Sequence, residues 1–195
     1  DVPCFSQALE LKDGDVASVI GCGGKTSLIY KLALENRHRR VLISTTTKIL
    51  SPPASLVDWQ LSPGETPRLG INLLCQEQGF KLGGVPAEVL WKACPADGLT
   101  LVEADGSKQL PLKGWAEYEP LVLPFTTVTI GVVSLWAVGL PCGENIVHRP
   151  ALFEALTGAK KGEAVRLHHV AAMLAHPQGM FQKAVGRRVL LISQV

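Results

Sequence analysis

The feature that most constrains this chain is a glycine-rich turn between a β-prone run and a helix-like segment. Residues 16–20 read VASVI, residues 21–24 read GCGG, and residues 25–36 place apolar side chains on one helical face. A second buried-type strand follows at 41–44. Two strands joined by a helix within about 30 residues form a βαβ unit, which crosses over right-handedly in a parallel sheet. We therefore expect a mainly parallel sheet.

The turn itself predicts a phosphate-binding loop. A phosphate chain needs inward-pointing backbone N–H groups, a helix N-terminus behind them and one long cation. Lys25, expected to be an exposed cation, would reach the β and γ phosphates, and the Thr26 hydroxyl would ligate Mg²⁺. The cofactor-binding residues expected here are Gly21, Cys22, Gly23, Gly24, Lys25, Thr26 and Ser27. The alternative is a glycine-rich turn followed by an ordinary helix.

The spacing departs from the usual GxxxxGK[ST] pattern, which would require glycine where this chain has Val19. The loop is two residues shorter and resembles the GxxGKT[ST] loop of the Mur ligase group, which binds ATP. We predict an α/β fold of the P-loop NTPase-like class, with a mainly parallel sheet flanked by helices. The expected cofactors are ATP or GTP, and Mg²⁺.

Two acids follow the next apolar strand, at 99–102, in the segment LTLVEADGSK. In P-loop proteins an acid at the carboxyl edge of such a strand holds Mg²⁺, and another can orient the attacking water. We assign Asp105 to the metal and Glu103 to the water or to the structure around it. Lys108, at the end of this segment, is included among the cofactor-binding residues. The alternative is an Asp-Gly turn with a solvated carboxylate.

Small hydroxyls also follow the second strand, in STTTK at 44–48. The ligand crevice of a parallel sheet opens at the carboxyl ends of its strands, so Thr46 or Thr47 is expected near Mg²⁺ or the γ-phosphate, and Lys48 near an anion. The alternative is that threonine is simply β-prone here.

Residues 145–150 read NIVHRP, just before an expected helix. Arg149 is a candidate for stabilising the charge of a transferring phosphate, and it completes a catalytic set with Lys25, Glu103 and Asp105. The alternative is a solvent-facing arginine beside helix-entry packing.

The rest of the chain supplies further elements. Residues 51–77 are proline-rich and read as an insertion or edge region, with one strand at 71–75. Pro86 suits the first position of a helix at 86–94. A helix is expected at 150–156, with Gly158 as its C-terminal cap, and another at 168–175. Strands are expected at 126–133 and 188–193.

Length and composition set broader limits. A chain of 195 residues suggests one domain, 1–195, and its C-terminal end is expected to be incomplete because the guanine-reading element of P-loop GTPases would follow the last strand. A net charge of +2 gives no reason to expect nucleic acid. The longest nearly uncharged stretch, 126–142, is too short and too glycine-broken to suggest a membrane span. Five widely spaced cysteines suggest a reducing, cytoplasmic setting.

Five blocks in order resemble the YqeC family: GCGGKTS, TTTK, VEADGSK with PLK at 111–113, EPLVLP at 119–124, and NIVHRP. The similarity runs from about residue 16 to residue 195. The family's usual loop is GAGGKTT, so Cys22 and Ser27 are departures. Cys22 occupies a small-residue slot, and Ser27 keeps the hydroxyl. The resemblance implies a P-loop NTPase-like accessory protein that helps mature selenium-dependent molybdenum hydroxylases, with such a hydroxylase or its cofactor as partner.

From the residues and the resemblance together we expect a Mg²⁺-dependent nucleoside triphosphatase. Two alternatives stay open. One is a module that binds a nucleotide or a molybdopterin-like phosphate without hydrolysing it, and the other is a small-molecule kinase or ligase.

Overall fold

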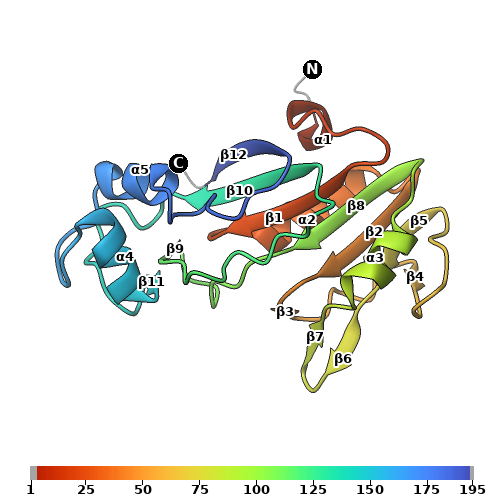
Figure 1. Cartoon of the computed structure of the whole chain (residues 1–195), viewed down its shortest axis with the longest axis horizontal. Coiled ribbons are helices and arrows are strands. Elements are labelled where there is room, and N and C mark those ends of the chain that lie inside the picture. The colour runs from red at the N-terminus through yellow and green to blue at the C-terminus, as the bar shows by residue number, and fades with distance from the viewer. Residues whose placement is uncertain (1–3, 194–195) are drawn as a thin grey trace.

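A seven-stranded parallel sheet forms the centre of the molecule (Figure 1). The computed structural model describes residues 4–193. The strands lie in the order β12-β10-β1-β8-β2-β5-β4, and every neighbouring pair in this sheet is parallel. Their bounds are β1 Val16–Gly21, β2 Arg40–Thr45, β4 Trp59–Gln60, β5 Gly70–Leu73, β8 Gly98–Glu103, β10 Val128–Ser134 and β12 Arg187–Ser193. The predicted α/β fold with a mainly parallel sheet is confirmed.

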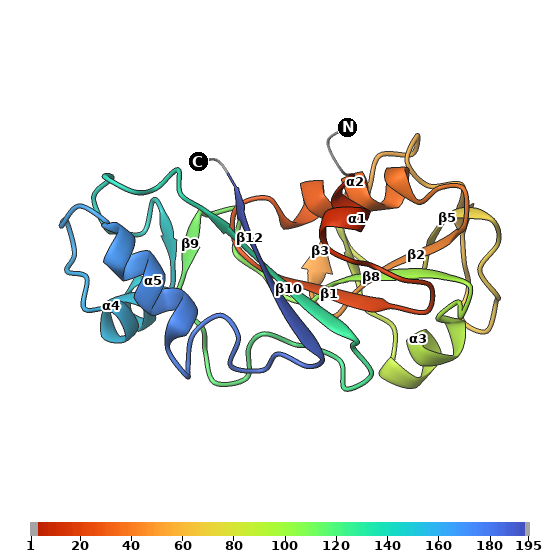
Figure 2. The same cartoon turned by 90° about the horizontal axis from the view of Figure 1, so that it is seen from above.

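The two faces of the sheet are covered by different helices (Figure 2). Helix α2 (Lys25–Glu35) packs with alternate strand residues such as Val41 and Ile43, whereas α3 (Ala87–Ala93) packs with the intervening Leu42. Successive side chains on a strand point to opposite faces, so one apolar strand packs against helices on both faces of the sheet. The short α1 (Phe5–Ala8) lies against α2. The Glu35 carboxylate, at the end of α2, accepts hydrogen bonds from the first two backbone N–H groups of α1.

A second group of elements extends beyond the carboxyl ends of β1 and β10. It comprises β9 (Leu112–Lys113), β11 (Val147–His148), α4 (Pro150–Thr157) and α5 (Leu167–Ala175). These elements share a separate apolar cluster that includes Ile20, Val133 and the fully buried Phe153. Gly158, in the left-handed conformation, ends α4 as predicted. We call this group the α4–α5 lobe.

A small antiparallel sheet was not predicted. Its strands lie in the order β3-β7-β6, with bounds β3 Lys48–Ile49, β6 Gln76–Gln78 and β7 Lys81–Gly83. The segment before β7 carries no sustained alternation of apolar and polar residues, and β3 and β7 are very short, so the sequence offers little strand signal. Ile49 and Leu82 pack on the main core and hold the small sheet against it.

Other boundaries differ slightly from expectation. Pro86 is the N-cap of α3 rather than its first residue, and β5 ends at Leu73 rather than at residue 75. Within residues 4–193, no helix has both the length and the apolar character needed to cross a membrane.

Candidate functional site

The predicted phosphate loop begins at the carboxyl end of strand β1, and its last residues, from Lys25 on, form the start of α2. Two of its glycines are required by space as well as by backbone conformation. A Cβ at Gly21 would lie 2.2 Å from the carbonyl oxygen of Val132, and a Cβ at Gly23 would lie 2.4 Å from the Cβ of Ser134. Both glycines also have positive φ, which side chains rarely tolerate. The turn is therefore packed tightly against the end of β10.

Lys25 is buried rather than exposed, with 5% of its surface accessible, which corrects the sequence expectation. Its ammonium group folds back over the loop and donates to the carbonyl oxygen of Gly21 (2.8 Å) and to the hydroxyl of Ser107 (3.2 Å). Both acceptors are neutral, so the positive charge of Lys25 is not cancelled by these contacts. The side chain is held over the loop where a phosphate would lie.

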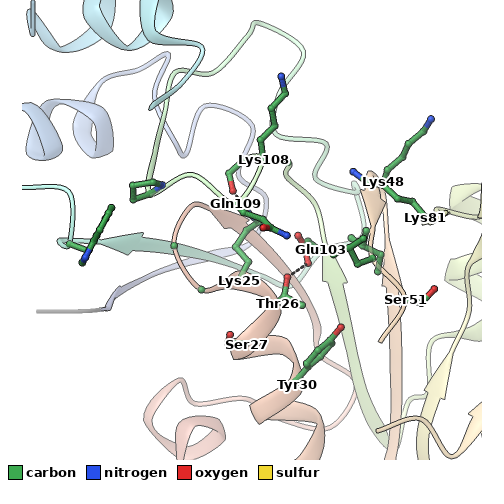
Figure 3. A pocket seen from close by; sticks show the side chains of 18 residues that line it. Lys25, Thr26, Ser27, Tyr30, Lys48, Ser51, Lys81, Glu103, Lys108 and Gln109 are labelled. Atoms are coloured by element: carbon green, nitrogen blue, oxygen red, sulfur yellow. Dashed lines mark hydrogen bonds between the residues drawn. The ribbon is translucent and has the colours of Figure 1, made fainter. Parts of the chain in front are cut away.

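Thr26 and Glu103 meet at the base of the site (Figure 3). The Thr26 hydroxyl donates to a carboxylate oxygen of Glu103 over 3.0 Å. Burial raises the pKa of the Glu103 carboxyl, whereas the charge of Lys25 and the Thr26 hydrogen bond act in the lowering direction. A hydroxyl at the start of α2 and a carboxylate at the end of β8 are oxygen donors of the kind that Mg²⁺ takes. These two residues fit a Mg²⁺ site.

Asp105 lies in a different environment. It is 1% exposed, and it accepts hydrogen bonds from the backbone N–H of Gly21 (3.1 Å), the indole N–H of Trp115 (2.8 Å) and the ammonium of Lys113. Lys113 is fully buried and forms a second ion pair with Glu119, 3.2 Å away, which in turn pairs with Arg149. The carboxylate predicted to hold the metal is thus occupied inside the fold, and the geometry favours Glu103 for that role.

A cavity of about 760 Å³ opens above the loop. Of the predicted site residues, its lining includes Gly23, Gly24, Lys25, Thr26, Ser27, Lys48, Glu103 and Lys108. Gly21, Cys22, Thr46, Thr47, Asp105 and Arg149 do not line it. The structure therefore brings the phosphate loop, one acid and two of the predicted flanking lysines to one cavity.

The threonine at the end of β2 and the two that follow it form hydrogen bonds within the fold. The Thr45 hydroxyl donates to the carbonyl oxygen of Glu103, and the Thr47 hydroxyl lies 3.2 Å from that of Thr45. The Thr46 hydroxyl donates to the carbonyl oxygen of Leu121 over 2.8 Å. These contacts fix the strand end that neighbours Glu103, and the predicted ligand contacts of Thr46 and Thr47 remain predictions.

Arg149 is the N-cap residue of α4, as expected just before the helix, but its guanidinium faces the loop that follows β9. It pairs with Glu119 and donates to the Tyr118 hydroxyl over 3.0 Å. The neighbouring His148 is half-buried, and burial lowers the pKa of its imidazole, as do the nearby charges of Lys113 and Lys108. The phosphate-stabilising role of Arg149 remains a prediction, and this geometry does not favour it.

Several cavity residues were not predicted from the sequence, among them Tyr30, Lys81, Gln109 and Trp136. Lys81 and Trp136 come from segments without any recognisable motif. Tyr30 lies four residues after Thr26 on the predicted helix and so shares its face, and its place beside the loop could have been inferred from helical geometry. Gln109 directly follows the predicted Lys108, and that adjacency was its one signal in the sequence.

Comparison with known proteins gives two matches. The family model described as "YqeC protein" matches residues 17–151. The chain is also 33% identical, over 196 aligned residues, to "Uncharacterized protein YqeC" of Escherichia coli (strain K12), and the match covers 92% of this chain and 75% of that protein. No solved structure matches significantly.

Proposed function

The chain belongs to the YqeC family, and from that premise we propose that it binds a nucleoside triphosphate with Mg²⁺ in the cavity above Gly21–Ser27 and hydrolyses it. The observation that carries the proposal is the Thr26–Glu103 contact beside the buried ammonium of Lys25, at the mouth of a strand–loop–helix turn. A role as accessory factor in the maturation of selenium-dependent molybdenum hydroxylases is proposed from the family resemblance, and the nucleotide chemistry from the site.

Each group in the cavity has a role that follows from its chemistry. Backbone N–H groups of the loop and the N-terminus of α2 face the phosphates, and Lys25 exchanges its neutral acceptors for phosphate oxygens. Thr26 and Glu103 would hold the metal, Glu103 directly or through water. Bound Mg²⁺ would neutralise charge on the terminal phosphates.

The base would lie toward the β10 side of the loop. The cavity reaches Trp136, which is 60% exposed and follows the end of β10 by two residues. Every nucleobase has a π-face that stacks on an aromatic ring, a contact worth about 1–3 kcal/mol per base. Trp136 is therefore our candidate for the base platform.

Lys25→Ala is the decisive test. We expect it to weaken triphosphate binding about 10- to 150-fold, because a charged hydrogen-bond donor contributes about 1.5–3 kcal/mol. The measurement is calorimetric titration with ATP, GTP and CTP in Mg²⁺, supported by phosphate release. Lys31→Ala is the matched control, since Lys31 lies on the same helix and only pairs at the surface with Glu35.

Equal triphosphate affinity in the Lys25→Ala variant and the parent would refute the phosphate-loop assignment. Tight binding without phosphate release would favour the non-hydrolysing module, for which molybdopterin nucleotides belong in the same panel. Nucleoside diphosphate formed only when an acceptor is added would favour a kinase or ligase.

A further inference from the structure

The small antiparallel sheet presents two lysines to the cavity (Figure 3). Lys48 on β3 is opposite Gly83 on β7, so Lys81, two residues before Gly83, shares the face of Lys48 and is its diagonal neighbour. Ile49 and Leu82 alternate with these lysines and point into the main core. Both lysine side chains are exposed. The sheet thus has an apolar side that docks on the protein and a cationic side that faces the cavity.

No carboxylate of residues 4–193 lies within ion-pair distance of Lys48, Lys81 or Lys108, the third flanking lysine of the cavity. Among the described residues that line the cavity, Glu103 is the single acidic one. As diagonal neighbours on one face of the small sheet, the two ammonium groups repel each other across solvent. A bound anion would remove that repulsion.

The small sheet is also fixed in place. Gly84, which directly follows β7, approaches the end of β2 so closely that a Cβ would lie 2.2 Å from the carbonyl oxygen of Thr45. Thr45 is in register with Glu103 on the neighbouring strand β8. Lys48 and Lys81 are therefore attached to the same strand ends that hold the proposed metal site.

The phosphate loop already has its own means of binding a triphosphate: its backbone N–H groups, the N-terminus of α2 and Lys25. Lys48 and Lys81 come from a different sheet, on the β2 side of Glu103, whereas Trp136 lies on the β10 side. A nucleotide with its base toward Trp136 has its terminal phosphate toward the lysines. Lysine ammonium groups act as point charges and bind phosphate in this way.

We propose that Lys48 and Lys81, with Lys108, form a second anion subsite that binds a small phosphate-bearing molecule next to the terminal phosphate of the nucleotide. The inference rests on the proposed function and deepens it: the site has room and charge for a second reactant as well as for a nucleotide. The part of the proposed function on which the inference rests is the binding of the triphosphate: water is the acceptor when the subsite is empty, and the bound phosphate-bearing molecule lies next to the same terminal phosphate when it is filled.

The test uses the full chain saturated with a non-hydrolysable triphosphate analogue and Mg²⁺, so that the phosphate loop is filled. Inorganic phosphate is then titrated and its affinity is measured from the broadening of its ³¹P resonance, with acetate as a carboxylate probe in a parallel competition. The variant is Lys48→Ala combined with Lys81→Ala. The control is Lys160→Ala combined with Lys161→Ala, which removes the same charge from the exposed loop after α4.

We expect the Lys48/Lys81 variant to lose at least about tenfold in phosphate affinity while its affinity for the analogue stays within about twofold, and the control to match the parent. Unchanged phosphate affinity overturns the subsite, and so does a parent that binds no phosphate once the analogue is bound. A loss of analogue affinity as large as that of Lys25→Ala overturns it too, because the lysines then hold the nucleotide itself.

Failure of the proposed function can be distinguished from failure of the subsite. If the parent binds no triphosphate, the phosphate titration is repeated without nucleotide in the Lys25→Ala background, where the loop has lost its cation. Loss of phosphate binding on adding the Lys48 and Lys81 changes supports the subsite in the absence of any nucleotide site, whereas no change overturns both.

Discussion

Two charged clusters lie within a few residues of each other at the end of β8, and they use their charges in opposite ways. Around Glu103 the charges face an open cavity, where four lysines line the wall together with this carboxylate. Around Asp105 the charges face each other, in a chain of ion pairs that runs from the buried Asp105 through Lys113 and Glu119 to the partly exposed Arg149. The first cluster has charge to offer a ligand, whereas the second uses its charge inside the fold.

The difference arises from the path of the chain beyond the sheet. Glu103 is the last residue of β8, and its side chain points over the loop of β1. Asp105 already lies in the segment that leads into the α4–α5 lobe, and it joins that lobe to the phosphate loop by accepting the N–H of Gly21. An acid two residues away from a cavity-lining acid can thus be structural. A short distance in sequence carries no guarantee of a shared role.

The largest expected effect concerns the closed cluster. Lys113→Met should lower the free energy of unfolding by about 3–5 kcal/mol, because removing one partner of a buried ion pair leaves the other charge uncompensated. Denaturant unfolding followed by circular dichroism measures it, with the exposed Lys160→Met as control. A loss below about 1 kcal/mol would show that the chain of charges adds little to the fold.

The next prediction compares the two acids directly. Mg²⁺ should raise the triphosphate affinity of the Glu103→Gln variant less than it raises that of the parent, by a factor on the order of 10 to 100, because a metal-holding group is lost. Asp105→Asn should instead lower stability, since its oxygens serve Lys113, Trp115 and Gly21. The measurement is a Mg²⁺ titration of nucleotide affinity beside thermal unfolding of each variant. The reverse result would return the metal to Asp105.

A smaller effect is expected at Cys22, which lies in the loop but packs into the apolar cluster of the α4–α5 lobe. Burial raises the pKa of its thiol to about 12, so the thiol stays protonated near neutral pH and should resist alkylation. Cys22→Ala should cost about 1 kcal/mol of stability and leave nucleotide binding unchanged. Rapid labelling of Cys22 in the native protein, detected by mass spectrometry, would contradict this account.

The smallest effect belongs to a carboxylate outside both clusters. Burial alone would raise the pKa of Glu35, but hydrogen bonds from the backbone N–H groups of Ser6 and Phe5 and from the Ser6 hydroxyl lower it overall. A lowered folded-state pKa gives stability that is present above the unfolded value and is lost as pH falls through the folded one. Glu35→Gln should therefore flatten the acid side of the stability–pH curve, measured by thermal unfolding between about pH 2 and 6. A curve that keeps the slope of the parent would argue against these hydrogen bonds.

The sequence alone predicted the central fold well, for local reasons. The glycine turn, the apolar runs before and after it and the helical face of α2 are encoded over short stretches, so β1, α2, β2, β8 and β10 were all expected close to their observed bounds. The loop glycines needed no tertiary information either, because a tight turn ahead of a lysine and a threonine is itself the signal.

Only the tertiary structure decided which charges face the cavity. Lys81 comes from a strand of three residues with no motif, and it reaches the site because Leu82 docks the small sheet on the core. Asp105 and Glu103 share one face by the two-residue strand period, but the chain leaves the sheet after Glu103, and Lys113 and Trp115 then enclose Asp105. Burial and long-range pairing depend on contacts between segments far apart in the chain, and no local pattern of residues records them.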